Sequence, residues 1–317
     1  MPLQLRRGNV KPADSNSVEK KIKRGNAQRQ GSWFRRLRGW LLLGLLLGLL
    51  LLSAGLAWLY SSSDDDITEV WVRQSQLLQE KKFFEVPCSE DYENYQRYPG
   101  CTPQKCGRAV TDTVVTREEA ERIRRIAERG LALGGSDGGA SILDLHSGAL
   151  SRGQHFVNIY RYFGDQIKDV FSEEDFQLYR TMRQRIQEAV ARTFGLDVSR
   201  LYLTKPTFFS RMNGTEAKTP HDEYWHPHID KVTYGSFDYT SLLYLSDYGS
   251  DFGGGRFVFM DGVANRTVEP RSGRVSFFSS GSENLHRVEK VRWGTRFAIT
   301  VSFTCDPAHA ITDPALP

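Results

Sequence analysis

Charged residues are absent from residues 41–60, which are dominated by leucine. A buried helix of a soluble protein is rarely apolar on every face, so this composition argues against an ordinary core helix. Together with Trp40 the run has about 21 residues, or roughly 31 Å of helix, which matches the hydrocarbon core of a bilayer. Trp58 and Tyr60 at the other end suit the second interface. The run therefore predicts a single transmembrane helix over residues 41–60.

Acidic residues are scarce in the first forty positions, where only Asp14 and Glu19 oppose eleven lysines and arginines. Because basic residues gather on the cytosolic side, we expect a single-pass type II membrane protein whose C-terminal bulk lies in the secretory-pathway lumen or outside the cell. The long apolar run favours an uncleaved signal-anchor over a cleaved signal peptide. This tail carries +9 (eleven minus two) of the net charge of +4, which leaves −5 for the remainder. The basic charge thus belongs to the tail, and nucleic-acid binding gains no support.

Cysteine is also scarce, and all four cysteines follow the apolar run: Cys88, Cys101, Cys106 and Cys305. In an oxidising lumen an even number predicts up to two disulfides, with three possible pairings. The spacing of the middle two cysteines is poor for a zinc site. Two N-x-T sequons, at Asn213 and Asn265, predict glycosylation on the luminal side.

Alternating strand and helix patterns are lacking, which argues against βαβ units and favours an α+β fold. Capping boxes predict one helix from Thr116 to about Gly130 and another from Ser172 to Phe194. After residue 200, short runs of β-branched and aromatic residues predict a β-sandwich or a barrel-like jelly roll. The glycine-rich stretch 134–139 lacks the strand–turn–helix setting of a phosphate-binding loop, so no nucleotide site is expected.

These patterns predict one catalytic domain with attachments and not two independent domains. The expected segments are a basic cytosolic tail (1–40), a transmembrane signal-anchor (41–60), a stem and cysteine-containing segment (61–115), a helical support region (116–199), a β-rich catalytic domain (200–306) and a C-terminal tail (307–317).

His228 and Asp230 are two residues apart, so both side chains would point to one face of a regular strand. His286 follows an apolar run and a polar turn, and it can complete a set of three ligands. Two imidazoles and one carboxylate hold Fe(II) on one face and leave the other coordination positions open. His221 and His226 compete for this role, but His228 fits a triad that contains a carboxylate better. We therefore predict a metal site at His228, Asp230 and His286.

Arg296 begins an apolar strand ten residues after His286. An arginine can bind a carboxylate through two parallel N–H···O bonds. Most arginines form surface ion pairs, but the place of Arg296 just beyond a candidate metal ligand favours the carboxylate of a co-substrate. Thr300 lies on the same face and can add a hydrogen bond from its hydroxyl. The pattern therefore predicts an oxygenase that binds iron and an acidic co-substrate.

Residues 202–306 resemble the 2-oxoglutarate- and Fe(II)-dependent dioxygenases, especially the prolyl and lysyl hydroxylase branch. The matching elements are His228-x-Asp230, Tyr244-Leu245-Ser246-Asp247 and residues 251–257, 281–286 and 294–303. The resemblance implies a double-stranded β-helix with flanking helices, in which His228, Asp230 and His286 bind iron and Arg296 binds the C5 carboxylate of 2-oxoglutarate. It also places Tyr244 beside that carboxylate, although a packed strand tyrosine is an equal alternative.

The resemblance further implies a membrane-anchored luminal dioxygenase that uses Fe(II), 2-oxoglutarate and O2, with ascorbate as reductant. Its substrate would be a C–H bond of a peptidyl prolyl or lysyl residue in a secreted or luminal protein, and other substrates stay open. One alternative is a catalytically silent jelly roll that serves as a binding module. Another is a type II glycosyltransferase, which fits poorly because Asp64-Asp65-Asp66 lies against the predicted membrane.

Overall fold

The computed structural model describes residues 40–53, 55, 68–93 and 97–316, and the chain divides into two units, Met1–Asp66 and Ile67–Pro317. Within the described residues, no helix is both long enough and apolar enough to cross a membrane. The helical residues described in the first unit are 40–53 and 55.

The prediction of a transmembrane helix over residues 41–60 is therefore wrong, and so is the predicted localisation as a single-pass membrane protein that depended on it. The expectation rested on the apolar composition of the run alone. Residues 54 and 56–60 of the predicted span lie outside the described residues. The predicted basic tail, apart from Trp40, and Asp64-Asp65-Asp66 also lie outside them.

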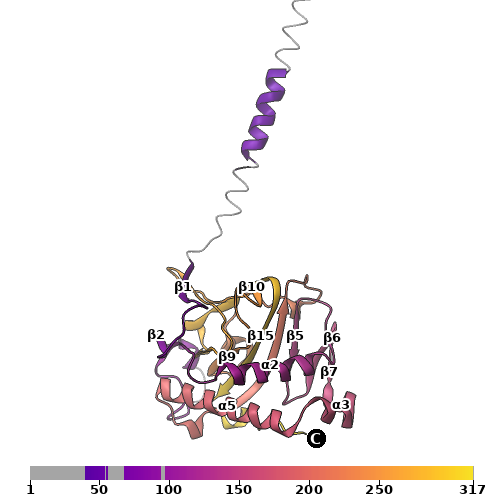
Figure 1. The fold of residues 1–317 in the computed structure, drawn as a ribbon. Coiled ribbons are helices and arrows are strands. Elements are labelled where there is room, and N and C mark those ends of the chain that lie inside the picture. Colours follow the sequence, from indigo (N-terminus) through magenta and orange to yellow (C-terminus); the bar gives the residue numbers. More distant parts are fainter. Residues whose placement is uncertain (1–39, 54, 56–67, 94–96, 317) are drawn as a thin grey trace, which may run out of the picture. The chain divides into compact units, whose positions relative to one another are not determined.

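Two β-sheets form the framework of the unit Ile67–Pro317 (Figure 1). The larger sheet has the strand order β2-β3-β13-β9-β15-β8-β5-β6-β4, with β10 paired to β15 and β7 paired to β6. The smaller sheet has the order β1-β12-β11-β14. The strands are β1 (Thr68–Val72), β2 (Lys82–Val86), β3 (Cys106–Thr111), β4 (Gly135–Ser136), β5 (Ala140–Leu143), β6 (Ala149–Gly153), β7 (His155–Asn158), β8 (Tyr202–Asn213), β9 (Tyr239–Tyr244), β10 (Phe252–Gly254), β11 (Phe257–Phe259), β12 (Asn265–Val268), β13 (Val275–Ser279), β14 (His286–Val288) and β15 (Val291–Thr304).

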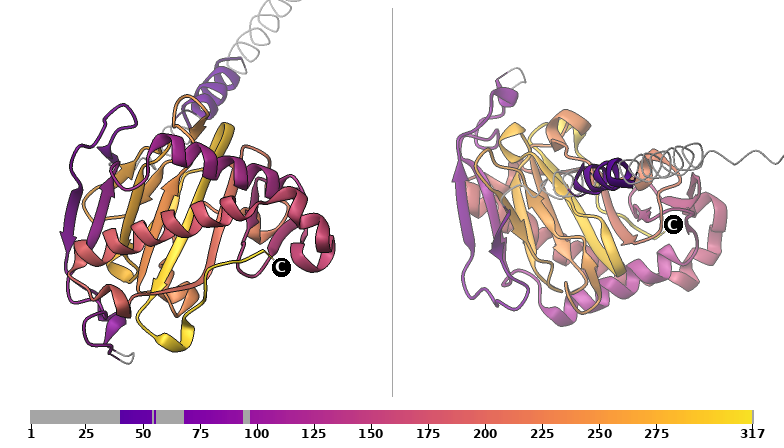
Figure 2. Two further views of the ribbon diagram at one scale, coloured as in Figure 1. Left: turned by 60° about the horizontal axis from the view of Figure 1, so that its bottom comes forward. Right: turned by 90° about the horizontal axis from the view of Figure 1, so that it is seen from above.

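Two long helices, α2 (Arg117–Leu131) and α5 (Glu173–Phe194), lie side by side across one face of the larger sheet (Figure 2). Both begin with the predicted capping boxes, at Thr116 and Ser172. The short helices are α3 (Ile159–Phe163), α4 (Ile167–Val170) and α6 (Asp230–Tyr234). Gly130 does not end α2, which continues to Leu131. A Cβ at Gly130 would lie 2.3 Å from Leu143 and 2.7 Å from Phe171, so the glycine serves close packing.

Strand β15 separates two hydrophobic cores because its side chains alternate between its two faces. Phe297, Ile299 and Val301 belong to the core beneath α2 and α5. Ala298 belongs to the second core, which lies between the larger and the smaller sheet. Two facing sheets with helices on one side match the predicted jelly roll with flanking helices.

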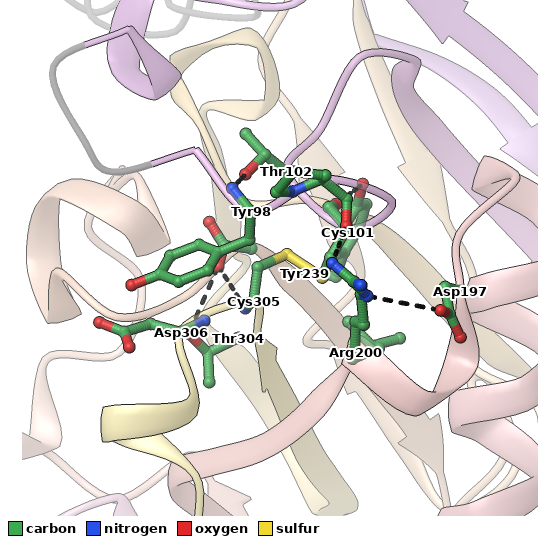
Figure 3. Close-up of a disulfide and its surroundings, with 12 residues drawn as sticks. Tyr98, Cys101, Thr102, Asp197, Arg200, Tyr239, Thr304, Cys305 and Asp306 are labelled. Carbon is green, nitrogen blue, oxygen red and sulfur yellow. Dashed lines mark hydrogen bonds and ion pairs between the residues drawn. A yellow bond between two sulfur atoms is a disulfide. The ribbon is translucent and has the colours of Figure 1, made fainter.

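The segment predicted as a stem contributes strands to both sheets. Strand β1 pairs in parallel with β12, and β2 and β3 extend the larger sheet beside β13. Of the three possible disulfide pairings, the structure has Cys88–Cys106 and Cys101–Cys305. The second disulfide ties this segment to the residue that follows β15, where the hydroxyl of Tyr239 donates to the Cys101 carbonyl (Figure 3). The cysteine segment is thus part of the unit Ile67–Pro317.

The two predicted glycosylation sites differ in their surroundings. Asn265 is buried at the start of β12. Asn213 is half-buried at the end of β8, where its side-chain oxygen accepts a hydrogen bond from the backbone of Thr215. A glycan requires a side chain that is open to solvent, so the environment of Asn265 disfavours modification in the folded state.

Candidate metal centre and co-substrate pocket

The three predicted metal ligands converge in the structure. The Nε2 atoms of His228 and His286 lie 3.6 and 3.7 Å from Oδ1 of Asp230, and one ligand atom from each residue lies within 4.8 Å of the others. His228 and His286 are adjacent because their backbones form an isolated antiparallel bridge, with N···O distances of 2.9 and 3.1 Å. Two imidazoles and one carboxylate on one side of a shared point can hold a divalent metal ion.

Asp230 differs from the prediction in its backbone, since it begins α6 and is not part of a regular strand. The intervening Ile229 is extended, with φ −119° and ψ 121°. Its extended conformation preserves the alternation that brings His228 and Asp230 to one side, and the helix begins only afterwards. The two-residue spacing therefore predicted that His228 and Asp230 share one side, although Asp230 belongs to a helix and not to a strand.

Hydrogen bonds orient each ligand toward the centre. Nδ1 of His228 lies 3.0 Å from the His226 carbonyl, and Nδ1 of His286 lies 2.8 Å from the Asn284 carbonyl. A carbonyl can only accept, so both Nδ1 atoms carry a proton, and Nε2 is the nitrogen of each ring that faces the shared point. The Thr240 hydroxyl donates to Oδ2 of Asp230 at 2.6 Å, which leaves Oδ1 facing the two histidines.

His286 lies in an apolar environment, packed against the rings of Phe257 and Phe278 at centroid distances of 5.0 and 4.9 Å. Burial lowers the pKa of His286 to about 4, although the neighbouring Asp230 carboxylate acts in the opposite direction. The ring is thus neutral at physiological pH. The neutral imidazole is the form that binds a metal ion.

Arg296 is a buried cation that lacks a counter-ion in the described part of the chain. Its side chain is 1% exposed, and Nε donates to the Gly255 carbonyl at 3.0 Å. Its Nη2 is buried and has no hydrogen-bond partner among the described residues. Burying a guanidinium without a partner is costly, so the arrangement suits an anionic ligand that enters the pocket. These observations fit the carboxylate of 2-oxoglutarate.

Thr300 and Tyr244 have different surroundings. Thr300 lines the same cavity as Arg296, whereas Tyr244 is not among the described residues that line it. The Tyr244 hydroxyl lies 3.1 Å from that of Ser276, and the Arg296 guanidinium carbon is 5.6 Å from the centre of the Tyr244 ring. The Tyr244 ring therefore lies next to the Arg296 guanidinium and outside the cavity lining.

Tyr224 is a cavity residue that the sequence analysis missed. Its hydroxyl accepts the Val291 N–H at 2.9 Å and donates weakly to the Asn213 carbonyl at 3.4 Å. Burial raises the pKa of Tyr224, while the positive charge of Arg296 acts against that shift. Tyr224 lies in a loop outside the strand pattern, so no periodicity marks it.

The cavity has a volume of about 380 Å³ and extends from the three ligands to the surface. Its inner lining is apolar, with Leu242, Phe257 and Val288 beside the metal ligands. Of the competing histidines, His221 lines the cavity outside the triad, and the exposed His226 pairs with Glu223 at 2.8 Å. A metal ion and a small dicarboxylate can therefore bind next to each other in a water-poor pocket.

Comparison with known proteins agrees with this geometry. Residues 209–304 match the family described as the 2OG-Fe(II) oxygenase superfamily. The protein called 2-oxoglutarate and iron-dependent oxygenase domain-containing protein 3 from Mus musculus is 71% identical over 261 residues, which cover 82% of each chain. The Rattus norvegicus protein of that name is 63% identical over 311 residues, which cover 98% of each chain. The chain belongs to the 2OG-Fe(II) oxygenase superfamily.

A more distant relative is prolyl 3-hydroxylase 1 of Homo sapiens, which is 32% identical over 154 residues that cover 43% of this chain and 20% of that protein. Membership in the superfamily confirms the predicted dioxygenase and its use of Fe(II), 2-oxoglutarate and O2. It favours the oxygenase over the binding module and the glycosyltransferase. The superfamily match identifies the chemistry, and His228, Asp230 and His286 form a cluster that could hold the metal ion.

Proposed function

We propose that the chain hydroxylates a C–H bond of a prolyl or lysyl residue within a polypeptide. The observation that carries this proposal is the aromatic rim of the cavity. Phe156 and Tyr234 line the cavity and are 46% and 40% exposed. Large aromatic side chains that remain in solvent at a cavity mouth are typical of surfaces that a macromolecule covers. The relationship to prolyl 3-hydroxylase 1 supports a peptidyl substrate.

The residues of the chain would divide the task among them. His228, Asp230 and His286 would hold Fe(II), and Arg296 would bind one carboxylate of 2-oxoglutarate. When bound, Fe(II), 2-oxoglutarate and O2 together supply the oxidation, in which 2-oxoglutarate becomes succinate and CO2 and the substrate gains a hydroxyl group. Leu242, Phe257 and Val288 exclude water from the reacting atoms. The Thr240 hydroxyl keeps the Asp230 carboxylate in position.

A peptide survey tests the proposal. The purified full-length chain would be incubated with Fe(II), 2-oxoglutarate, ascorbate and O2, together with peptide pools that contain proline, lysine or neither. We expect succinate release to rise with a proline or lysine pool, and mass spectrometry to find one added oxygen atom on that residue. Asp230→Ala is the inactive control. Equal stimulation by free amino acids and by peptides would contradict a polypeptide substrate.

A variant of the cavity rim extends the same experiment. Phe156→Ala removes an exposed ring at the mouth and leaves the metal ligands and Arg296 in place. We expect it to lower kcat/KM for the peptide about 10-fold, as for an interface aromatic residue, and to leave KM for 2-oxoglutarate unchanged. An unchanged kcat/KM for the peptide would remove the rim from substrate binding, even if the dioxygenase activity itself were confirmed.

A further inference from the structure

The segment that follows Cys88 contacts the turn that precedes the metal ligand His286. This segment lies far outside residues 209–304, the part of the chain that matches the oxygenase family. It contains the short 3-10 helix Glu90–Tyr92, and the Cys88–Cys106 disulfide fixes its beginning to β3. The turn, residues 281–284, includes the 3-10 helix Ser282–Asn284 and leads directly into β14, which begins at His286. We refer to these two elements as the Tyr92 segment and the ligand turn.

Tyr92 binds the ligand turn through both hydrogen-bonding functions of its hydroxyl. The hydroxyl donates to Oε1 of Glu283 at 3.0 Å and accepts the Gly281 N–H at 2.7 Å. Oε2 of Glu283 in turn accepts the Ser89 N–H at 3.3 Å. The Ser282 N–H donates to the Asp91 carboxylate at 2.5 Å. Three consecutive residues of the turn are therefore held by the Tyr92 segment.

The two elements are closely packed against each other. Tyr92 is only 4% exposed. A Cβ at Gly281 would lie 2.5 Å from the Ser89 hydroxyl and 2.9 Å from the Tyr92 hydroxyl. It would also lie 2.4 Å from Glu283 Oε2, so a larger residue at this position would have to displace the side chains that join the two elements. The contact is a specific fit and not a loose surface approach.

The ligand turn transmits its position to His286 through Asn284. The Asn284 carbonyl accepts the Nδ1–H of His286 at 2.8 Å, which fixes the tautomer that leaves Nε2 free for metal. The Asn284 side-chain amide donates to the Ser279 and Gly107 carbonyls at 2.9 and 3.3 Å. Gly107 follows the disulfide-bonded Cys106. Both ends of the disulfide-closed segment thus contact the turn that orients one metal ligand.

Tyr92 also lies beside the second metal-binding element. The Lys231 ammonium is 5.4 Å from the centre of the Tyr92 ring and 3.0 Å from a carboxylate oxygen of Asp238. Lys231 follows the metal ligand Asp230, and its backbone N–H donates to the Ser280 carbonyl at 2.9 Å. Tyr92 therefore contacts both the ligand turn that precedes His286 and the residue that follows Asp230.

We propose that Tyr92 is a positioning residue for the metal centre. Its hydroxyl holds the ligand turn in place, so that the Asn284 carbonyl aims the imidazole of His286 at the metal. Direct hydrogen-bond partners of metal ligands typically change metal affinity by 10–100-fold when they are removed, and Tyr92 acts on such a partner, the Asn284 carbonyl, through the ligand turn. The role concerns metal binding and does not depend on which substrate the enzyme hydroxylates.

Cobalt binding by the full-length chain tests this role without any turnover. Co(II) would be titrated into the metal-free protein and followed by its visible absorption. Tyr92→Phe keeps the ring and removes both hydrogen bonds of the hydroxyl, and we expect it to weaken Co(II) binding about 10-fold. The matched control is Tyr179→Phe, which removes a buried hydroxyl on α5 that lies 2.8 Å from His146 Nε2. The control should lower Tm by a similar amount and leave Co(II) affinity unchanged.

Glu283→Gln provides a second variant in case Tyr92→Phe does not fold. An amide has one acceptor oxygen where the carboxylate has two, so the Tyr92 hydroxyl and the Ser89 N–H can no longer each donate to a separate oxygen of residue 283. We expect a loss of Co(II) affinity similar to that of Tyr92→Phe, and little further loss in the double variant, because both residues act through one contact. The proposal is overturned if Co(II) affinity stays within about twofold of wild type in the folded variants, or if Tyr179→Phe weakens it equally.

Discussion

The two faces of the larger sheet have contrasting chemistry, although the same strands form both. On β15, Phe297, Ile299 and Val301 face the helices and belong to a continuous hydrophobic core. On the other face the same strand presents Arg296, whose buried Nη2 lacks a partner among the described residues, and Thr300. The helix-facing side chains of β15 are apolar and have no polar atoms to satisfy, whereas its other face carries a buried Nη2 without a partner among the described residues, where a ligand would bind. On β15, the residues that stabilise the core beneath the helices and the residues that would bind a ligand thus lie on opposite faces.

The largest effect should come from the inner side. Asp230→Ala removes the carboxylate that lies 3.6 and 3.7 Å from the two histidines. We expect it to abolish succinate formation from 2-oxoglutarate, because two imidazoles alone do not complete the metal site. The far-UV circular dichroism and the Tm of the metal-free chain should stay close to those of the wild type. Persistent succinate formation in this variant would refute the ligand assignment.

The sequence allowed this part of the site to be predicted because its information is local. His228 and Asp230 are two residues apart, and the chemistry of Arg296 restricts the ligands it can bind. The capping boxes at Thr116 and Ser172 are likewise contained within four residues. Features of this kind require no knowledge of the rest of the chain.

Other features depend on long-range contacts and could not be predicted. Strand β1 pairs with β12 almost two hundred residues later, so nothing near Thr68 indicates a place in a sheet. The Cys101–Cys305 pairing spans 204 residues and was one of three possibilities. Tyr224 reaches the cavity from a loop. The apolar run 41–60 led to the prediction of a membrane span, whereas no helix of the described residues is long and apolar enough to be one.

The helix-facing side should show the opposite behaviour. Ile299→Ala leaves a cavity in the core beneath α2 and α5, where Ile299 is fully buried. We expect the free energy of unfolding to fall by about 2–5 kcal/mol. Measured by urea denaturation, this loss should be accompanied by an unchanged Co(II) affinity in the folded protein. A large loss of Co(II) affinity would show that the two sides of β15 are coupled.

A pH titration sharpens the comparison within the inner side. Burial lowers the folded-state pKa of His286 to about 4, below the ordinary value of 6.5. Between these values the unfolded chain binds the proton more readily, so the stability contributed by neutral His286 is complete above pH 6.5 and is lost as pH falls toward 4. The loss is on the order of 3 kcal/mol for the metal-free chain. His286→Phe should lack this component in urea denaturation at pH 7 and 4.5, and an identical pH dependence would contradict the assignment.

Arg296 offers the most direct test of the division between stability and function. Its guanidinium is buried without a counter-ion in the described part of the chain, and burial lowers its pKa. Arg296→Leu should weaken 2-oxoglutarate binding about 100-fold, because the charge-assisted bonds to the carboxylate are lost. The ligand-free chain should nevertheless be as stable as wild type or more stable, since an unpaired buried charge has been replaced by an apolar side chain. Calorimetric titration with 2-oxoglutarate and thermal unfolding without it measure the two effects separately. If the variant lost stability and kept its affinity, Arg296 would be a structural residue, and the inner side of β15 would follow the same packing rule as the helix-facing side.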